Sequence, residues 1–185
     1  MVPACVKTTD AGRLKDFNTY LRGVSMKAIR IMVLPLLLAV QGLAWGGINA
    51  GSAAYQKGDY DAALQVWRPL AEQGNAMAQL NLGYMYDQGY GVPQDFQEAI
   101  KWYRRAAEQG NDRAQYNLGL MYDNGDGVPQ DYVQAHMWYD IAGVEVATKY
   151  RDFVAREMTP EQIAEAKRLA REWQMKHYPR RVSSR

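Results

Sequence analysis

The motif YDQGYGVPQD occupies Tyr86–Asp95, and it returns as YDNGDGVPQD at Tyr122–Asp131, an offset of 36 positions (86 to 122). The motif AEQGN recurs at the same offset, at Ala71–Asn75 and Ala107–Asn111. A period of this length with small, aromatic and glycine positions is typical of helical repeats, in which no unit buries its apolar face alone and neighbouring units must stack. The sequence therefore predicts an all-α fold, a short solenoid of antiparallel helix pairs.

A third, fainter copy of the repeat lies one period upstream. The segment DYDAALQVW at Asp59–Trp67 aligns with DFQEAIKWY at Asp95–Tyr103 and with DYVQAHMWY at Asp131–Tyr139. After the repeats, Thr159 and Pro160 are the N-cap and first-turn residues typical of a helix start. The predicted organisation is a degenerate N-terminal helical hairpin at 50–74, repeats at 75–110 and 111–143, capping helices at 144–176 and a basic disordered tail at 177–185.

Glycine and apolar positions indicate how the helices pack. Gly83 and Gly119 lie inside the predicted first helix of each repeat, where glycine costs about 1 kcal/mol relative to alanine. We therefore expect the partner helix to approach closely at these two positions. In the segment 144–157, the apolar spacing predicts one more helix that packs on the stack. Its expected packing residues are Val146, Tyr150, Phe153 and Val154.

The front of the chain is interpreted as targeting sequence. Residues 1–25 show neither helical nor strand periodicity and are predicted to be an upstream extension, because a coherent pattern begins at Met26. Basic residues there precede the apolar run 31–40, and small residues follow up to Ala44, as in a signal peptide. The run is shorter than the about 20 residues that span a bilayer. We expect a signal peptide at 26–44, a periplasmic or secreted protein, and no membrane span after cleavage; an uncleaved anchor is the alternative.

The charge and cysteine content argue against nucleic-acid binding and against cysteine chemistry. Of the 22 basic and 20 acidic residues, six basic and two acidic residues lie in 1–44, so the remainder is mildly acidic. The repeats contain no basic stripe of the kind that neutralises phosphates, and we expect no nucleic-acid partner. The single cysteine, Cys5, lies in the front segment. The mature protein is therefore expected to form no internal disulfide and no thiolate metal site.

The sequence contains no pattern that indicates catalysis. It has no recognisable Ser, His and acid constellation and no phosphate-binding glycine loop, so we expect no enzyme and no cofactor. The segment DNGDG at Asp123–Gly127 lacks the carboxylate spacing of a calcium loop. His136 has no second histidine or cysteine at ligand spacing, so we expect no metal site and a surface or hydrogen-bonded histidine there.

The repeated pattern AxxxLGxMYxxGxGVPQDxxxAxxWYxxAAEQGN resembles the Sel1-like repeat, a relative of the tetratricopeptide repeat. The resemblance covers about 55–142 and is most specific over 78–111. It implies a right-handed superhelix of helix pairs that serves as a scaffold for protein or peptide partners, and it implies no reaction. A cysteine-rich subset of the family is linked to binding of β-lactams and cell-wall precursors, and this chain lacks those cysteines.

Differences between the two strong copies point to candidate contact residues. Positions that are identical in both copies meet packing demands that both units share, whereas positions that differ are available for a ligand. If the first helix of each repeat lines the concave face, several of the residues that differ between the copies face a partner. Asn81 and Asn117 are identical, and their amides could grip a peptide backbone or clamp a neighbouring helix. The predicted partner-binding residues are Asn81, Tyr84, Gln88, Arg113, Tyr116, Asn117 and Asn124.

Together, these patterns indicate a non-catalytic interaction scaffold that binds a peptide or an envelope protein on its concave helical face. The alternative is a protein that binds or modifies cell-wall fragments, such as muropeptides or β-lactam-like molecules. A third hypothesis is weak self-association through the open ends of so short a solenoid.

Overall fold

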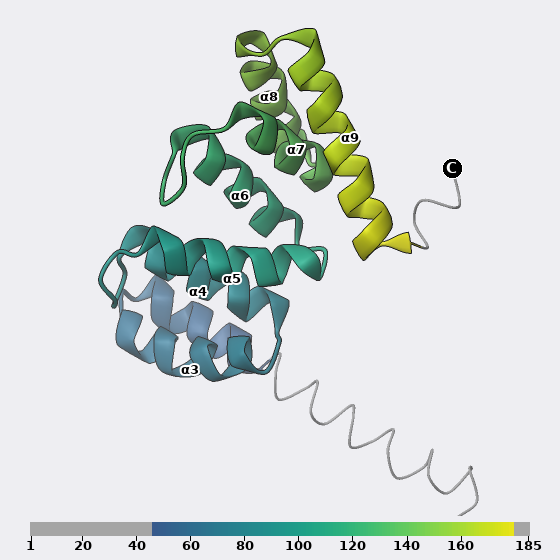
Figure 1. Ribbon diagram of the computed structural model, residues 1–185. Helices are drawn as coiled ribbons and strands as arrows, with labels where there is room; N and C mark the ends of the chain where they lie inside the picture. The colour runs from purple at the N-terminus through teal and green to yellow at the C-terminus, as the bar shows by residue number, and fades with distance from the viewer. Residues whose placement is uncertain (1–45, 180–185) are drawn as a thin grey trace, which may run out of the picture. The chain divides into compact units, whose positions relative to one another are not determined.

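The computed structural model describes residues 46–179, and all regular secondary structure in this range is helical (Figure 1). The predicted upstream extension, the signal peptide, Cys5 and the tail residues 180–185 lie outside the described range. Within the range, the prediction of a short all-α solenoid of repeats is confirmed.

The helices follow one another through short turns. Residues 46–56 are helical, so the first hairpin begins earlier than the predicted position 50. The next helices are α3 (Tyr60–Glu72), α4 (Ala76–Gln88), α5 (Phe96–Glu108), α6 (Asp112–Asn124), α7 (Tyr132–Ala142), α8 (Glu145–Val154), the 3-10 turn η1 (Ala155–Glu157) and α9 (Pro160–His177). From α3 to α8 each helix packs against the next, and α9 turns back onto α7 (Figure 1).

The repeated motif sets the helix ends. Asn75 and Asn111 are the N-caps of α4 and α6, and each side-chain oxygen accepts a backbone N–H of the first turn. At the other end, Gly89 and Gly125 close these helices with φ of 72° and 80°, a left-handed conformation that favours glycine. The residues that cap the helices therefore recur with the same 36-residue period as the apolar positions.

Close approach of the partner helix at Gly83 and Gly119 is confirmed. A Cβ added to Gly83 would lie 2.7 Å from Cδ1 of Tyr103 on α5. A Cβ added to Gly119 would lie 2.5 Å from Cδ1 of Tyr139 on α7. Both tyrosines are fully buried. Glycine is repeated here because an aromatic ring occupies the space of a side chain.

The polar residues that repeat have structural partners. Each buried tyrosine donates its hydroxyl hydrogen to an aspartate of the paired helix, with an Oη to Oδ2 distance of 3.1 Å in both repeats. Two buried glutamines donate from Nε2 to a carbonyl oxygen of the preceding helix at 3.0 Å. These pairs are Tyr103–Asp87, Tyr139–Asp123, Gln79–Ala71 and Gln115–Ala107.

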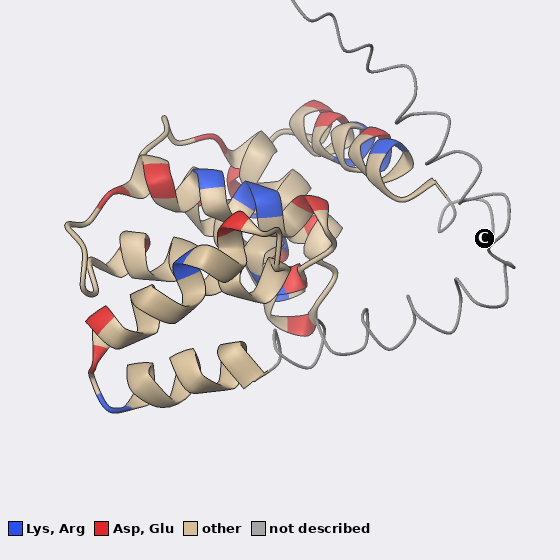
Figure 2. Ribbon diagram, turned by 90° about the horizontal axis from the view of Figure 1, so that it is seen from below, with Lys and Arg blue, Asp and Glu red and all other residues tan. Residues whose placement is uncertain are grey.

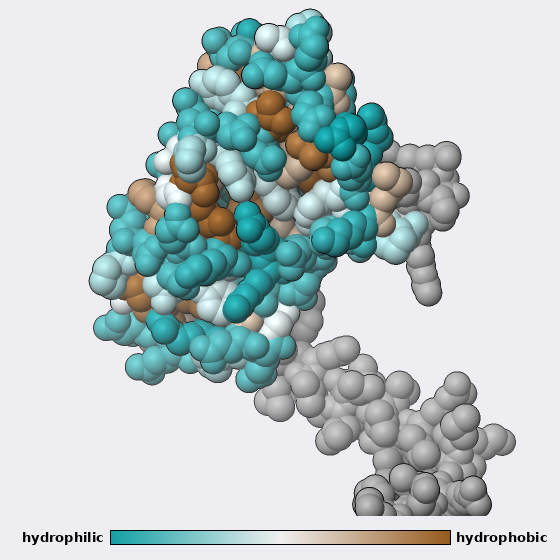
Figure 3. Space-filling view, in the orientation of Figure 1, coloured by the Kyte–Doolittle hydropathy of each residue, from teal (hydrophilic) through white to brown (hydrophobic). Residues whose placement is uncertain are grey.

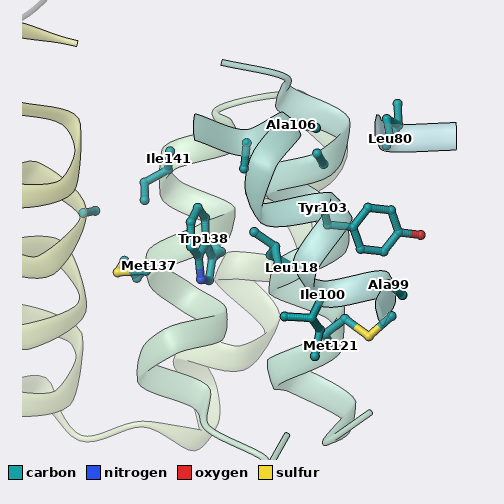
Figure 4. Close-up of a cluster of buried hydrophobic side chains, with 13 residues drawn as sticks. Leu80, Ala99, Ile100, Tyr103, Ala106, Leu118, Met121, Met137, Trp138 and Ile141 are labelled. Atoms are coloured by element: carbon teal, nitrogen blue, oxygen red, sulfur yellow. The ribbon is translucent and has the colours of Figure 1, made fainter. Parts of the chain in front are cut away.

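The largest core cluster joins the two repeats to the C-terminal helix. Figure 4 shows Tyr103, Leu118 and Trp138 in this cluster, contributed by α5, α6 and α7. Ala170 of α9 completes it on the far side. The core is therefore continuous from the first repeat to α9, as expected when single hairpins cannot bury their own apolar faces.

Helix α8 packs differently from the prediction. The expected packing residues Val146, Tyr150 and Phe153 are 45%, 40% and 60% exposed. The helix is instead buried through Ala147 and Val154. Small side chains at the contact let α8 approach α7 closely, which turns the larger apolar residues outward. The prediction was right for Val154 and wrong for the other three.

The tail prediction is wrong for its first residues. Helix α9 includes His177, and Tyr178 follows it in a fixed position. The Tyr178 hydroxyl donates to the carbonyl oxygen of Ala107 (2.7 Å) and accepts from Nε2 of Gln115 (3.1 Å). Tyr178 thus anchors the end of α9 to the turn between the repeats.

His136 is buried, so the expectation of a surface histidine is wrong, and one of its ring nitrogens also lacks a hydrogen-bond partner within the described residues. Its side chain is 2% exposed, and its Nδ1 atom has no hydrogen-bond partner within the described residues. Burial lowers the pKa of His136 below its usual value; Asp140 and a backbone hydrogen bond oppose this shift, and Arg151 and Lys167 reinforce it. The equivalent residue of the first repeat is Ile100, which is also buried.

His136→Ile is expected to raise the free energy of unfolding near neutral pH by about 1 kcal/mol, because it removes a buried polar atom without a partner. Because the folded-state pKa is lowered, stability falls in the wild type as pH drops through the unfolded-state value of about 6.5, where only the unfolded chain gains a proton. The variant should lose this dependence in urea titrations, whereas His177→Gln should keep it. An unchanged pH dependence in His136→Ile would refute the assignment.

A groove on the first helices of the repeats

The first helices of the repeats and α8 line a depression of about 370 Å³, which we call the groove. Its lining residues are Leu80, Asn81 and Tyr84 of α4, Arg113, Tyr116 and Asn117 of α6, and Val146 of α8. A second depression shares Asn81 and Tyr84 and extends toward Ser52, Tyr55 and Gln56. Five of the seven predicted partner-binding residues therefore lie together.

Helical spacing and the repeat period explain this clustering. Residues 80, 81 and 84, like residues 113, 116 and 117, are three and four positions apart and share one helix face. The 36-residue period relates Leu80 to Tyr116 and Asn81 to Asn117. Stacked repeats place such equivalent positions next to each other, so one face of each first helix contributes to a single surface.

The two asparagines of the groove have different surroundings. Burial raises the pKa of Tyr103, Asp87 acts in the same direction, and a hydrogen bond from Asn117 lowers it. Asn117 therefore links α6 to the preceding helix, α5, through this hydrogen bond. At the equivalent place behind Asn81 the sequence has Trp67, whose indole N–H is directed to a backbone carbonyl at 3.4 Å. Asn81 makes no side-chain hydrogen bond within residues 46–179, so its amide is available to a ligand.

Aromatic residues border the groove at both ends. Tyr84 is 39% exposed and meets Tyr55 edge-on with ring centroids 6.3 Å apart. Tyr116 meets Tyr150 of α8 in the same manner at 5.5 Å. Burial and the neighbouring tyrosines raise the pKa of Tyr55 and of Tyr116 to about 12. Both hydroxyls therefore stay protonated at neutral pH and can donate hydrogen bonds.

Not every predicted residue reaches the groove. Gln88 is exposed at the end of α4, and Asn124 donates from Nδ2 to Oδ2 of Asp126 at 3.0 Å; neither lines the groove. Sequence reasoning missed Val146 as a lining residue because its apolar spacing also fits core packing. Arg113 lines the groove and, in the described part of the chain, has no ion pair.

The charged side chains of the described residues are dispersed rather than gathered into an ion site. Within residues 46–179, no group of three or more His, Cys, Asp or Glu side chains could hold a metal ion. In the same range, no helix has both the length and the apolar character required to cross a membrane. Figure 2 shows acidic and basic residues interspersed along the helices, including α9.

The fold and the groove define a class of protein: short solenoids of helical hairpins, which generally serve as protein–protein interaction scaffolds. Residues 76–111 and 112–143 each match the Sel1 repeat. Residues 76–143 are therefore two Sel1-like repeats, as the sequence motif predicted.

The solved structures that are similar to the chain include the following two. A protective antigen present in uropathogenic Escherichia coli strains, which displays an SLR fold, is 36% identical with a TM-score of 0.70 over 76% of this chain and 32% of that one. A Sel1 repeat protein from Oxalobacter formigenes is 31% identical with a TM-score of 0.57 over 68% of this chain and 55% of that one. The chain thus spans about a third and about half of these proteins. No curated protein matches it.

Proposed function

We propose that the protein is a non-catalytic scaffold that binds an extended peptide segment of an envelope protein in the groove. The observation that supports this most directly is that aromatic, apolar and amide side chains from three helices line one depression, with Tyr84 and Val146 exposed. Tyrosine anchors supply large contact area at low entropic cost. The free amide of Asn81 suits a peptide backbone, which offers both donors and acceptors along its length.

Helix α8 extends the surface offered to the peptide. Val146 lies in the groove, and Tyr150 and Phe153 continue the same exposed apolar stripe one turn at a time. An exposed stripe of this kind beside a polar groove is typical of an interaction site. Export rests on the predicted signal peptide, and the similarity to a protective antigen of Escherichia coli supports a location in the envelope or outside the cell.

Affinity capture from an envelope extract tests the proposal. The full chain is compared with the variant Asn81→Ala/Tyr84→Ala, which should recover at least about tenfold less of the main captured protein. Its melting temperature should fall by only a few degrees, because Asn81 makes no side-chain hydrogen bond within the described residues and Tyr84, which loses its contact with Tyr55, is already 39% exposed. The control variant Gln88→Ala/Asn124→Ala changes predicted residues outside the groove and should capture as the wild type does.

Two outcomes would contradict the proposal. Equal capture by the groove variant and the wild type would place the partner elsewhere on the surface. Saturable binding of purified muropeptides, with no protein captured, would favour the alternative function in cell-wall binding.

A further inference from the structure

On another part of the surface, a depression of about 380 Å³ lies among the second helices of the repeats, where α5 and α7 meet α9. We call it the α9 pocket, and it shares no residue with the groove. Its apolar floor is formed by Met137, Trp138, Leu169 and Trp173, and its rim by Arg104, Glu172 and Lys176. Figure 3 shows apolar surface exposed alongside α9.

The floor of the α9 pocket is aromatic. Trp138 and Trp173 meet edge-on with ring centroids 5.2 Å apart. Trp138 is 3% exposed, and its indole N–H has no acceptor within the described residues. Figure 4 shows the nitrogen of this ring at the end that points away from Ile141. A rigid aromatic floor of this kind suits a bulky apolar side chain.

The rim of the pocket is positively charged. Arg104 donates from Nη2 to the Tyr122 hydroxyl at 3.2 Å, and neither Arg104 nor Lys176 forms an ion pair within residues 46–179. Glu172, the acidic residue of the rim, is already bound by Nη1 of Arg168 at 2.5 Å. Two cations that form no ion pair within residues 46–179 therefore flank an apolar floor. A carboxylate placed between them would gain charge-assisted hydrogen bonds.

A comparison with the first hairpin shows which features of the α9 pocket also occur there and which depend on α9. Arg68 of α3 makes the same bond to the Tyr86 hydroxyl, at 3.3 Å, as Arg104 makes to Tyr122. The depression beside Arg68 contains no tryptophan and includes the acidic residue Asp61. The arginine–tyrosine bond is thus a repeated structural contact. The α9 pocket has a second cation and an aromatic floor, which the depression beside Arg68 lacks.

The geometry points to a second peptide-binding site in the α9 pocket, for a linear segment in which carboxylates flank a bulky apolar side chain. The carboxylates lie against Arg104 and Lys176, and the apolar side chain rests on Trp138 and Trp173. The site uses a different set of helices from the groove, and it does not depend on the function proposed there.

Fluorescence anisotropy with three labelled peptides tests this inference on the full chain. The peptides differ only in a central EFEL, QFQL or ESES sequence. The EFEL peptide should bind at least about tenfold more tightly than either of the others. The variant Arg104→Gln/Lys176→Gln should weaken EFEL binding at least about tenfold, and added salt should weaken it in the wild type.

The control variant is Arg68→Gln/Lys57→Gln, which removes the equivalent arginine–tyrosine bond and one exposed lysine outside the pocket. It should bind the EFEL peptide as the wild type does, as should Arg113→Gln in the groove. The inference is overturned if EFEL and QFQL bind equally, if EFEL does not bind, or if only Arg113→Gln reduces its binding. It is also overturned if the pocket cations instead prove necessary for binding to anionic lipid vesicles without any peptide binding.

Discussion

Gly119→Ala is expected to lower the free energy of unfolding by about 2 kcal/mol, the middle of the range for overpacked cores. The added Cβ would lie 2.5 Å from Cδ1 of the Tyr139 ring and closer still to Cε1. That ring cannot move aside easily, because it is fully buried and its hydroxyl is bonded to Asp123. The gain of about 1 kcal/mol in helix propensity offsets only part of the clash. The melting temperature should fall by roughly 8 °C.

The matched control for this prediction is Gly46→Ala. Gly46 is also helical, but no neighbouring atom lies within 4 Å of the place that an added Cβ would occupy, so alanine there should be neutral or slightly stabilising. Gly83→Ala should be less harmful than Gly119→Ala, since its closest ring contact is 2.7 Å. Adding Tyr139→Leu to Gly119→Ala should recover part of the loss in a double-mutant cycle. Purely additive effects would show that the ring is not the cause.

The repeated residues make most of the fold predictable. A glycine inside a helix, repeated at the same offset, indicates a close partner, and the structure supplies the tyrosine rings opposite Gly83 and Gly119. The aspartates that receive the tyrosine hydroxyls, Asp87 and Asp123, recur at the same offset, but the period does not show which side chain each of them contacts. The same limit applies to Tyr178, whose partners Ala107 and Gln115 are far away in sequence.

The groove is predictable in part because it is built from repeat-equivalent positions. A comparison of the two copies indicates Asn81 and Tyr116, and both line the groove. Val146 cannot be found in this way, since α8 has no second copy for comparison. Its apolar spacing fits either a buried or an exposed stripe, and the small residue Ala147 at the contact decides which one is seen. The α9 pocket escapes sequence comparison because it depends on where α9 crosses α7.

Removal of α9 is expected to have the largest effect on stability. A chain that ends at Met158 loses the cover over Trp138 and Ile141, which are 3% and 8% exposed when α9 is present. Burial of each large apolar side chain contributes about 1.5–3 kcal/mol, so the loss is a substantial part of the about 5–15 kcal/mol typical of a domain. We expect a broadened transition at a much lower melting temperature, together with aggregation through the uncovered surface.

Two shorter truncations measure how much the last residues of the described chain contribute to stability. A chain that ends at Pro179 keeps Tyr178 and should melt like the full chain. One that ends at His177 loses both hydrogen bonds of the Tyr178 hydroxyl and should be destabilised by about 1–2 kcal/mol. Calorimetry of the three truncated chains should therefore give three distinct results. If the chain ending at Met158 melts as the full chain does, α9 is not a structural cap.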